Sequence, residues 1–208
     1  WDNTFYNSTT PSKSAFITSI SIIMVPIMLV ITGLQKISFK IWTSIIFAIL
    51  GLYLLLDPSG TGVNGGDIFT FACAACFAIH IILQDKYAKK GINVTRFFLI
   101  QVLAVTIFSF ICSMFFDTQT PVWTDELINA ILMTGIIATA IAILIMVWAQ
   151  QILSPSQTAL IFSLEPVFAA FFSWLLINEI LGIQGWFGGI LVVIAVVWSE
   201  SKSDGEIK

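Results

Sequence analysis

Glu165 and Pro166 are the two residues whose chemistry fits least with their surroundings. They stand side by side in S-L-E-P-V-F, within an otherwise apolar run at 158–177. A charged group at the centre of a membrane span costs about 2.5–3.5 kcal/mol on insertion scales, so it is found facing a wet cavity or paired with a partner. Proline removes a backbone donor and crowds the carbonyl four residues back, which favours irregular backbone beside a cavity. Glu165 is therefore a candidate to bind a solute or a proton. The alternative is a structural kink whose carboxylate hydrogen-bonds an adjacent helix.

A second set of polar residues repeats at helical spacing. Cys73, Phe77, His80 and Gln84 follow a 4-3-4 pattern, which places them on one helix face. His80 needs a polar partner in an apolar run and is a candidate cavity donor, whereas Gln84 is either a lining residue or an interface residue. With Cys76 the pattern also reads C-x-x-C-x-x-x-H. Zinc sites use four ligands with paired spacing, and the sequence has no second Cys/His pair. Packing thiols are the better interpretation, and no metal or cofactor is predicted.

Four more residues have candidate roles with simpler alternatives. Gln101 lies near the start of a later apolar run and is a candidate lining residue. Trp148 closes another run, where a tryptophan is commonly an interface residue. Gly185 and Gly189 form G-x-x-x-G, which lets two helix backbones pack closely. That pair serves either packing within the chain or a contact in a homodimer.

The motifs of several other protein classes are missing from the sequence. It has no H-E-x-x-H, no aspartate pair within an apolar run and no nucleophilic serine motif with histidine, so an enzyme is not predicted. A glycine-rich phosphate loop is also missing, which argues against an ATP-driven pump. Since no basic patch occurs, nucleic acid is not expected as a partner.

The elements that position these residues are apolar helices. Hydrophobic residues make up 58% of the chain and charged residues 10%, against roughly 25% charged in soluble domains. A helix crosses the bilayer with about 20 residues, and no alternating strand pattern of a barrel is present. The sequence therefore predicts an all-α membrane protein, a bundle of seven transmembrane helices embedded in the lipid bilayer. The runs are 15–34, 41–56, 68–83, 97–116, 127–149, 158–177 and 181–198.

Basic residues sort between alternate connections. One side carries Lys13 together with most of the acidic loop residues, and the other carries eight of the nine basic residues. Because basic residues in short loops stay on the cytoplasmic side, the C-terminal tail is expected inside and Trp1 outside a cell (inner or plasma) membrane. The basic residues of the inner side are Lys36, Lys40, Lys86, Lys89, Lys90, Arg96, Lys202 and Lys208.

An internal repeat is visible at a shift of 144 residues. It lays P-S-K-S-A-F-I-T-S (11–19) on P-S-Q-T-A-L-I-F-S (155–163). The implied unit has five helices, and an odd number of spans inverts the second copy in the membrane, which is a transporter architecture. Under this shift Glu165 falls on Ser21. Pro26 lies four positions past the equivalent of Pro166, so both copies are expected to kink this helix.

The same segments resemble a known family. L-E-P-V-F-A-A-F-F-S-W-L-L-I-N-E and G-W-F-G-G-I-L-V-V resemble the ninth and tenth helices of EamA-type permeases in the drug/metabolite transporter superfamily. P-S-K-S-A-F-I-T-S-I-S-I-I-M-V-P resembles the fourth helix, and G-D-I-F-T-F-A-C-A-A-C-F-A-I-H resembles the start of the sixth. The resemblance implies helices 4–10 of a ten-helix transporter built from two inverted five-helix repeats. Residues 1–56 would end the first repeat, 57–67 form an external loop, 68–199 form the second repeat and 200–208 a cytoplasmic tail.

The family resemblance also implies a function. We expect a secondary transporter that exports small metabolites, such as amino acids or related compounds, by alternating access. Coupling to protons is a hypothesis that rests on Glu165. The helix count leaves a seven-span receptor or a non-transport membrane scaffold as the alternative. A retinal protein would need a lysine within a span, and none of the seven runs contains one.

Overall fold

The chain folds into helices that are apolar enough to cross a membrane. The computed structural model describes residues 11–57, 64–116, 122–177 and 182–201. Over these residues all regular elements are helical, and they form seven candidate membrane spans. The prediction of an all-α protein with seven spans is confirmed. Trp1, most of the loop at 57–67 and nearly all of the tail at 200–208 lie outside the described residues.

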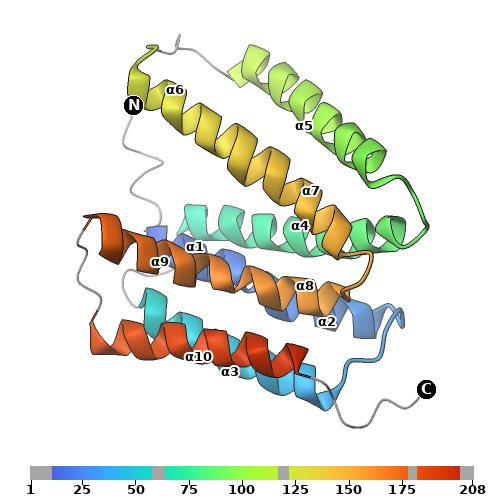
Figure 1. Ribbon diagram of the computed structural model, residues 1–208, viewed down its shortest axis with the longest axis vertical. Coiled ribbons are helices and arrows are strands. Elements are labelled where there is room, and N and C mark those ends of the chain that lie inside the picture. Colours follow the sequence, from blue (N-terminus) through green and yellow to red (C-terminus); the bar gives the residue numbers. More distant parts are fainter. Residues whose placement is uncertain (1–10, 58–63, 117–121, 178–181, 202–208) are drawn as a thin grey trace. The chain divides into compact units, whose positions relative to one another are not determined.

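The helices fall into two compact units, and the first contains the two segments that the 144-residue shift lays on each other. It comprises the described parts of Trp1–Ile82 and Ser154–Lys208, and its helices are coloured blue, teal and orange to red in Figure 1. These helices are α1 (Pro11–Ser19), α2 (Ser21–Ile31), α3 (Phe39–Leu56), the larger part of α4 (Gly65–Ala88), α8 (Pro155–Phe162), α9 (Leu164–Ile177) and α10 (Ile183–Glu200).

Two of the seven spans are interrupted near their middle. The first breaks at Ile20, between α1 and α2, and the sixth breaks at Ser163, between α8 and α9. Next to each break a serine hydroxyl donates to a backbone carbonyl three or four residues back, from Ser19 at 2.8 Å and from Ser163 at 2.5 Å. The N–H groups of Ile20 and Ser163 bond to carbonyls three residues back. Serine back-bonding and such tight turns bend a helix.

The two prolines of these spans lie on the C-terminal side of the breaks. Pro166 is the third residue of α9, in the first helical turn, where a missing N–H costs little because those donors have no intrahelical partner. Pro26 is buried inside α2, which continues to Ile31. The backbone therefore leaves helical geometry at Ser163 rather than at Pro166, and at Ile20 rather than at Pro26.

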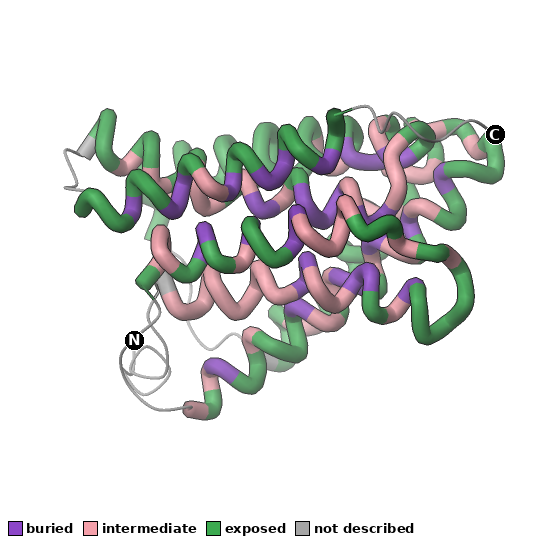
Figure 2. Tube along the Cα trace, turned by 90° about the horizontal axis from the view of Figure 1, so that it is seen from below, coloured by how far each residue is buried: buried purple, intermediate pink, exposed green. Residues whose placement is uncertain are grey.

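Helices α3 and α10 form the centre of the first unit. They lie side by side along their length (Figure 1), and α8 packs on both. Buried positions, purple in Figure 2, follow their facing sides. The buried apolar residues form one cluster from α2, α3, α8 and α10: Ile22, Ile45, Ala48, Leu52, Leu160, Val192 and Ala195.

Two glycines allow α3 and α10 to approach each other. A Cβ atom placed on Gly188 would lie 2.5 Å from the carbonyl oxygen of Gly51 and 2.6 Å from the amide nitrogen of Leu55. A Cβ on Gly51 would lie 2.7 Å from the carbonyl oxygen of Gly188. Since these neighbours are backbone atoms, any side chain at either position would force the helices apart.

Helix α4 is longer than the apolar run that predicts it. Its first turn is closed by a reciprocal cap, in which the Asp67 N–H donates to Asn64 Oδ1 (3.0 Å) and the Asn64 N–H donates to Asp67 Oδ2 (2.9 Å). Lys13 of α1 forms an ion pair with the same carboxylate at 2.5 Å. Capping satisfies donors that have no intrahelical partner, which explains the start at Gly65 instead of Ile68.

The observed helix bounds fit the 144-residue shift. Shifting α3 by this amount gives 183–200, the bounds of α10. The same shift carries α1 to 155–163 and α2 to 165–175, close to α8 and α9. The break at Ile20 is thereby placed one residue after the break at Ser163. The repeat itself stays a prediction, and these bounds support it.

The second unit covers Leu83–Leu153. It holds the end of α4, then α5 (Val94–Phe116), α6 (Asp125–Leu132), a π-helical stretch η1 (Met133–Ile141) and α7 (Ala142–Ala149), with α5 packed on α7. Within η1 the Thr139 hydroxyl donates to the carbonyl of Thr134, five residues back, at 2.8 Å. The apolar side chains of α5 are largely exposed in this unit, as expected for surfaces in contact with hydrocarbon or with further helices.

Candidate functional site

A polar cavity lies where the two helix breaks of the first unit face each other. It has a volume of about 200 Å³ and is lined by residues between 15 and 22 of α1 and α2, residues between 162 and 169 of α8 and α9, and Phe77 of α4. Helix α2 packs on α8, which brings the two interrupted spans together. Irregular backbone at membrane depth is tolerated where it lines a cavity, so the breaks and the cavity are expected to occur together.

The two sides of the cavity are equivalent positions of the proposed repeat. Under the 144-residue shift Ser19 falls on Ser163 and Ser21 falls on Glu165, and all four residues line the cavity. Binding at an interface between repeats is a feature of inverted-repeat transporters. The two sides differ in charge, because Ser21 stands where the other copy has the carboxylate of Glu165.

Glu165 is the ionisable residue among the described residues that line this cavity. It occupies the first turn of α9 and its side chain is exposed. The N-terminal end of a helix is the positive end of its dipole, so this position suits a carboxylate. Glu165 can therefore present a negative charge to a solute in the cavity.

Phe77 and Phe162 form the aromatic part of the lining. Their ring centroids are 5.3 Å apart at 80°, an edge-to-face contact. His80 lies one turn further along α4 and stacks on Phe77 with centroids 6.4 Å apart and planes at 14°. The imidazole thus touches a lining residue without being among the residues that line the cavity itself.

The remaining sequence candidates, Gln84, Gln101 and Trp148, belong to the second unit and do not line this cavity. Gln84 is 2% exposed, and neither polar atom of its amide has a hydrogen-bond partner among the described residues; the same holds for Nε2 of Gln101. Buried amides without partners are costly, so a water, a solute or further polypeptide is expected to satisfy them. Trp148 is 58% exposed, as expected for an interface residue.

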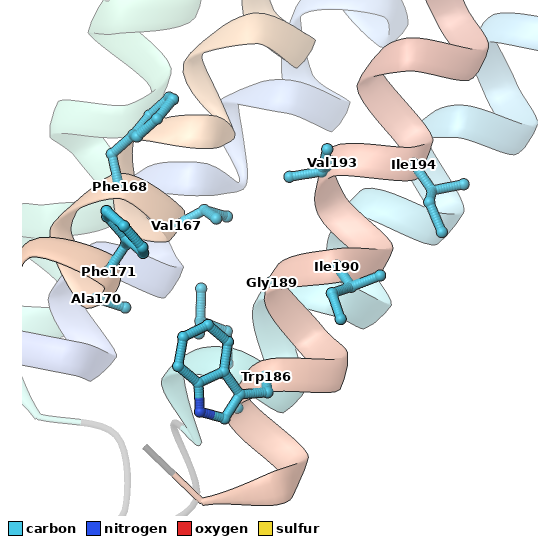
Figure 3. A pocket seen from close by; sticks show the side chains of 11 residues that line it. Val167, Phe168, Ala170, Phe171, Trp186, Gly189, Ile190, Val193 and Ile194 are labelled. Atoms are coloured by element: carbon cyan, nitrogen blue, oxygen red, sulfur yellow. The ribbon is translucent and has the colours of Figure 1, made fainter. Parts of the chain in front are cut away.

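A larger cavity between α9 and α10 is apolar. It measures about 360 Å³ and is lined by side chains such as Val167, Phe171, Trp186 and Ile190 (Figure 3). Both Gly185 and Gly189 line it, and a Cβ on Gly189 would lie 3.6 Å from Val167 Cγ1, an ordinary contact. Because the indole nitrogen of Trp186 is the polar side-chain atom among these otherwise apolar lining residues, this surface fits hydrocarbon better than a polar solute.

The hydroxyl residues of the cavity are not among the sequence candidates: Thr18, Ser19, Ser21 and Ser163. Hydroxyl residues in an apolar helix commonly bond to their own backbone, so they do not stand out by type. The 144-residue shift is the signal that identifies two of them, because it aligns Ser19 and Ser21 with Ser163 and Glu165. Among the described residues no group of three or more His, Cys, Asp or Glu side chains is arranged to hold a metal ion.

Seven apolar spans, two of them broken at a shared cavity, define a polytopic helical membrane protein. Residues 64–200 match the model of the EamA-like transporter family. The chain belongs to this family and is a multi-pass membrane protein.

Individual relatives agree with this membership. The chain is 31% identical over 189 residues to a protein of Archaeoglobus fulgidus named as an uncharacterized transporter, covering 91% of this chain and 60% of the relative. It is 30% identical over 74 residues to the permease-like protein YdzE of Bacillus subtilis, covering 36% of this chain and 95% of that protein. A solved crystal structure shares the fold with a TM-score of 0.76 at 14% identity, covering 94% of this chain and 70% of the other. The chain thus spans about 60% of the length of the archaeal relative.

Proposed function

We propose that this chain forms the larger part of a secondary transporter that exports small metabolites, such as amino acids or related compounds, by alternating access. The observation that carries the proposal is the cavity of about 200 Å³ at which the two interrupted spans meet with Glu165 in its wall. Membership of the EamA-like transporter family supports it. In this proposal the substrate occupies the cavity and rocking of one repeat against the other exposes it to each side in turn.

The proposed repeats divide the chain at the loop 57–67. Residues 1–56 end the first repeat and 68–199 form the second, which agrees with the extent of the family match at 64–200. The coincident helix bounds support an inverted pair, since each copy contributes one broken span to the cavity. Glu165 marks the asymmetry between the copies and is the group proposed to exchange a proton during transport.

Replacing Glu165 with glutamine is expected to reduce transport about tenfold or more, because a hydrogen bond to a charged group contributes roughly 1.5–3 kcal/mol. The measurement is uptake or export of a metabolite panel by the full-length protein in proteoliposomes, with and without an imposed pH gradient. Glu126→Gln is the matched control, since Glu126 lies in the first turn of α6 outside the cavity. If Glu165→Gln transports at the wild-type rate, the proposal that Glu165 is part of the substrate site is wrong. A reduced rate with full dependence on the pH gradient would contradict the proton role alone.

The proposed orientation places the C-terminal tail in the cytoplasm and residue 1 outside. With Cys73, Cys76 and Cys112 replaced by serine, single cysteines at Asp57 and Lys89 would lie on opposite sides of the membrane. We expect a membrane-impermeant maleimide to label Asp57→Cys on intact cells and Lys89→Cys after permeabilisation, because Lys89 lies in a basic connection. The reverse labelling would overturn this orientation.

A further inference from the structure

We propose that the cavity between the helix breaks selects a solute that carries an ammonium group and no carboxylate, an organic amine rather than a zwitterionic amino acid. This inference rests on the proposed transport function. Among small metabolites it favours amines over the amino acids given there as examples. Its basis is the direction of the hydrogen bonds in the cavity wall, together with the charge and aromatic content of that wall.

Three hydroxyl groups of the cavity wall are already used as donors. Thr18 donates to the carbonyl of Ser14 at 2.8 Å, Ser19 to that of Ala15 at 2.8 Å, and Ser163 to that of Leu160 at 2.5 Å. A hydroxyl has one hydrogen to donate and two lone pairs to accept with. These three groups therefore offer acceptor oxygens to a solute.

The remaining hydroxyl of the described wall, that of Ser21, can donate as well as accept. The backbone adds no donor at the breaks. The N–H groups of Ile20 and Ser163, which the breaks would otherwise free, donate to carbonyls three residues back at 3.1 and 3.0 Å. No Lys, Arg or His is found among the described lining residues, and the ionised carboxylate of Glu165 accepts without donating. An ammonium group supplies three donors and a positive charge, which complements this wall. A carboxylate would meet acceptors and the charge of Glu165.

Lys13, the nearest basic residue along the first interrupted span, adds no positive charge to the cavity wall. Lys13 forms an ion pair with Asp67 at 2.5 Å, and the two side chains are 13% and 6% exposed. Its charge is thus compensated outside the cavity. The carboxylate of Glu165 remains as the charge that the cavity presents to a solute.

The aromatic lining suits the same ligand. Phe77 and Phe162 meet edge to face at 5.3 Å, and both residues line the cavity. Cations bind to aromatic faces within about 6 Å of the ring centroid. A carboxylate combined with aromatic rings and hydroxyl oxygens is therefore a site for an organic ammonium ion.

Three probes of matched carbon skeleton test the inference. 2-Phenylethylamine carries the ammonium group, L-phenylalanine adds a carboxylate, and 3-phenylpropionate carries the carboxylate alone. Binding of each to the purified chain in lipid nanodiscs is measured by titration calorimetry. We expect the amine to bind about tenfold to a hundredfold more tightly than the amino acid, the range for a hydrogen bond to a charged group, and the acid to bind least.

Variants of the chain assign the selectivity to the cavity. Glu165→Gln is expected to remove the preference for the amine, Phe77→Leu to weaken amine binding with less effect, and Glu126→Gln to leave all three affinities unchanged. Unaltered melting temperatures show that each variant is folded. Binding of the amino acid as tight as that of the amine, an amine affinity insensitive to Glu165→Gln, or no binding of any probe would overturn the inference. Glu165-dependent export of a carboxylate-bearing solute by the full-length protein would overturn the amine class while leaving the transport function standing.

Discussion

Gly188→Ala is expected to destabilise the protein by about 2–3 kcal/mol, at the upper end of the range for overpacking. The added Cβ would lie 2.5 Å from the carbonyl oxygen of Gly51 and 2.6 Å from the amide nitrogen of Leu55. Because both are backbone atoms of α3, the two helices must separate, which opens the central cluster of the first unit. In a chain of this length the melting temperature should fall by roughly 5–10 °C, as measured by scanning calorimetry or by intrinsic tryptophan fluorescence.

Two other glycines provide matched controls for this substitution. A Cβ on Gly135 of η1 would have no neighbour within 4 Å, and one on Gly189 would lie 3.6 Å from Val167 Cγ1. Since alanine is favoured over glycine inside a helix by about 1 kcal/mol, Gly135→Ala should be neutral or stabilising and Gly189→Ala nearly neutral. Gly51→Ala should resemble Gly188→Ala. A melting temperature of Gly188→Ala equal to that of Gly189→Ala would contradict the close approach of α3 and α10.

This pair of glycines also shows what the sequence could and could not predict about the packing. The seven spans follow from hydropathy, because burying backbone in hydrocarbon leaves the helix as the stable conformation for an isolated segment. Helix contacts depend instead on which residues face each other. The G-x-x-x-G pattern directs attention to Gly185 and Gly189, whereas the backbone contact uses Gly188, one position away, and Gly51, which stands in no motif.

The candidate site was predictable in part for a similar reason. Glu165 stands out because a charge within a span is costly, and Phe77 shares a helix face with other candidates. Both line the cavity. The position of the break was not predictable from proline chemistry alone, since Pro166 is tolerated in the first turn of α9 and the chain bends at Ser163 instead. The second wall of the cavity becomes visible once the repeat is applied to Ser19 and Ser21.

Asp67→Asn is expected to cost about 3 kcal/mol, because removing one partner of a buried ion pair leaves an uncompensated charge. Lys13 and Asp67 join the first turns of α1 and α4 at 2.5 Å, with side chains 13% and 6% exposed. The helix dipole makes the two partners unequal: it favours a carboxylate in the first turn of α4 and opposes an ammonium in the first turn of α1. Lys13→Met should therefore cost less than Asp67→Asn, since Asp67 keeps the support of its own helix and of the Asn64 N–H.

A double-mutant cycle tests this asymmetry. The Lys13→Met/Asp67→Asn variant should recover part of the stability lost in Asp67→Asn, since no unpaired charge remains. The coupling free energy between the two side chains should change little with salt concentration, because the pair is largely shielded from solvent. The control is the pair of Lys89 and Asp85, four residues apart at the C-terminal end of α4 at 2.6 Å, with side chains that are 41% and 14% exposed. Pairs four residues apart on a helix contribute about 0.3–0.5 kcal/mol when exposed. Because the lysine of this pair is the more exposed of the two lysines, Lys89→Met should cost less than Asp67→Asn. If Asp67→Asn melts no lower than Lys89→Met, the ion pair contributes no more than a surface contact. If Lys13→Met is the costlier single change, the helix dipoles do not set the balance between the two charges.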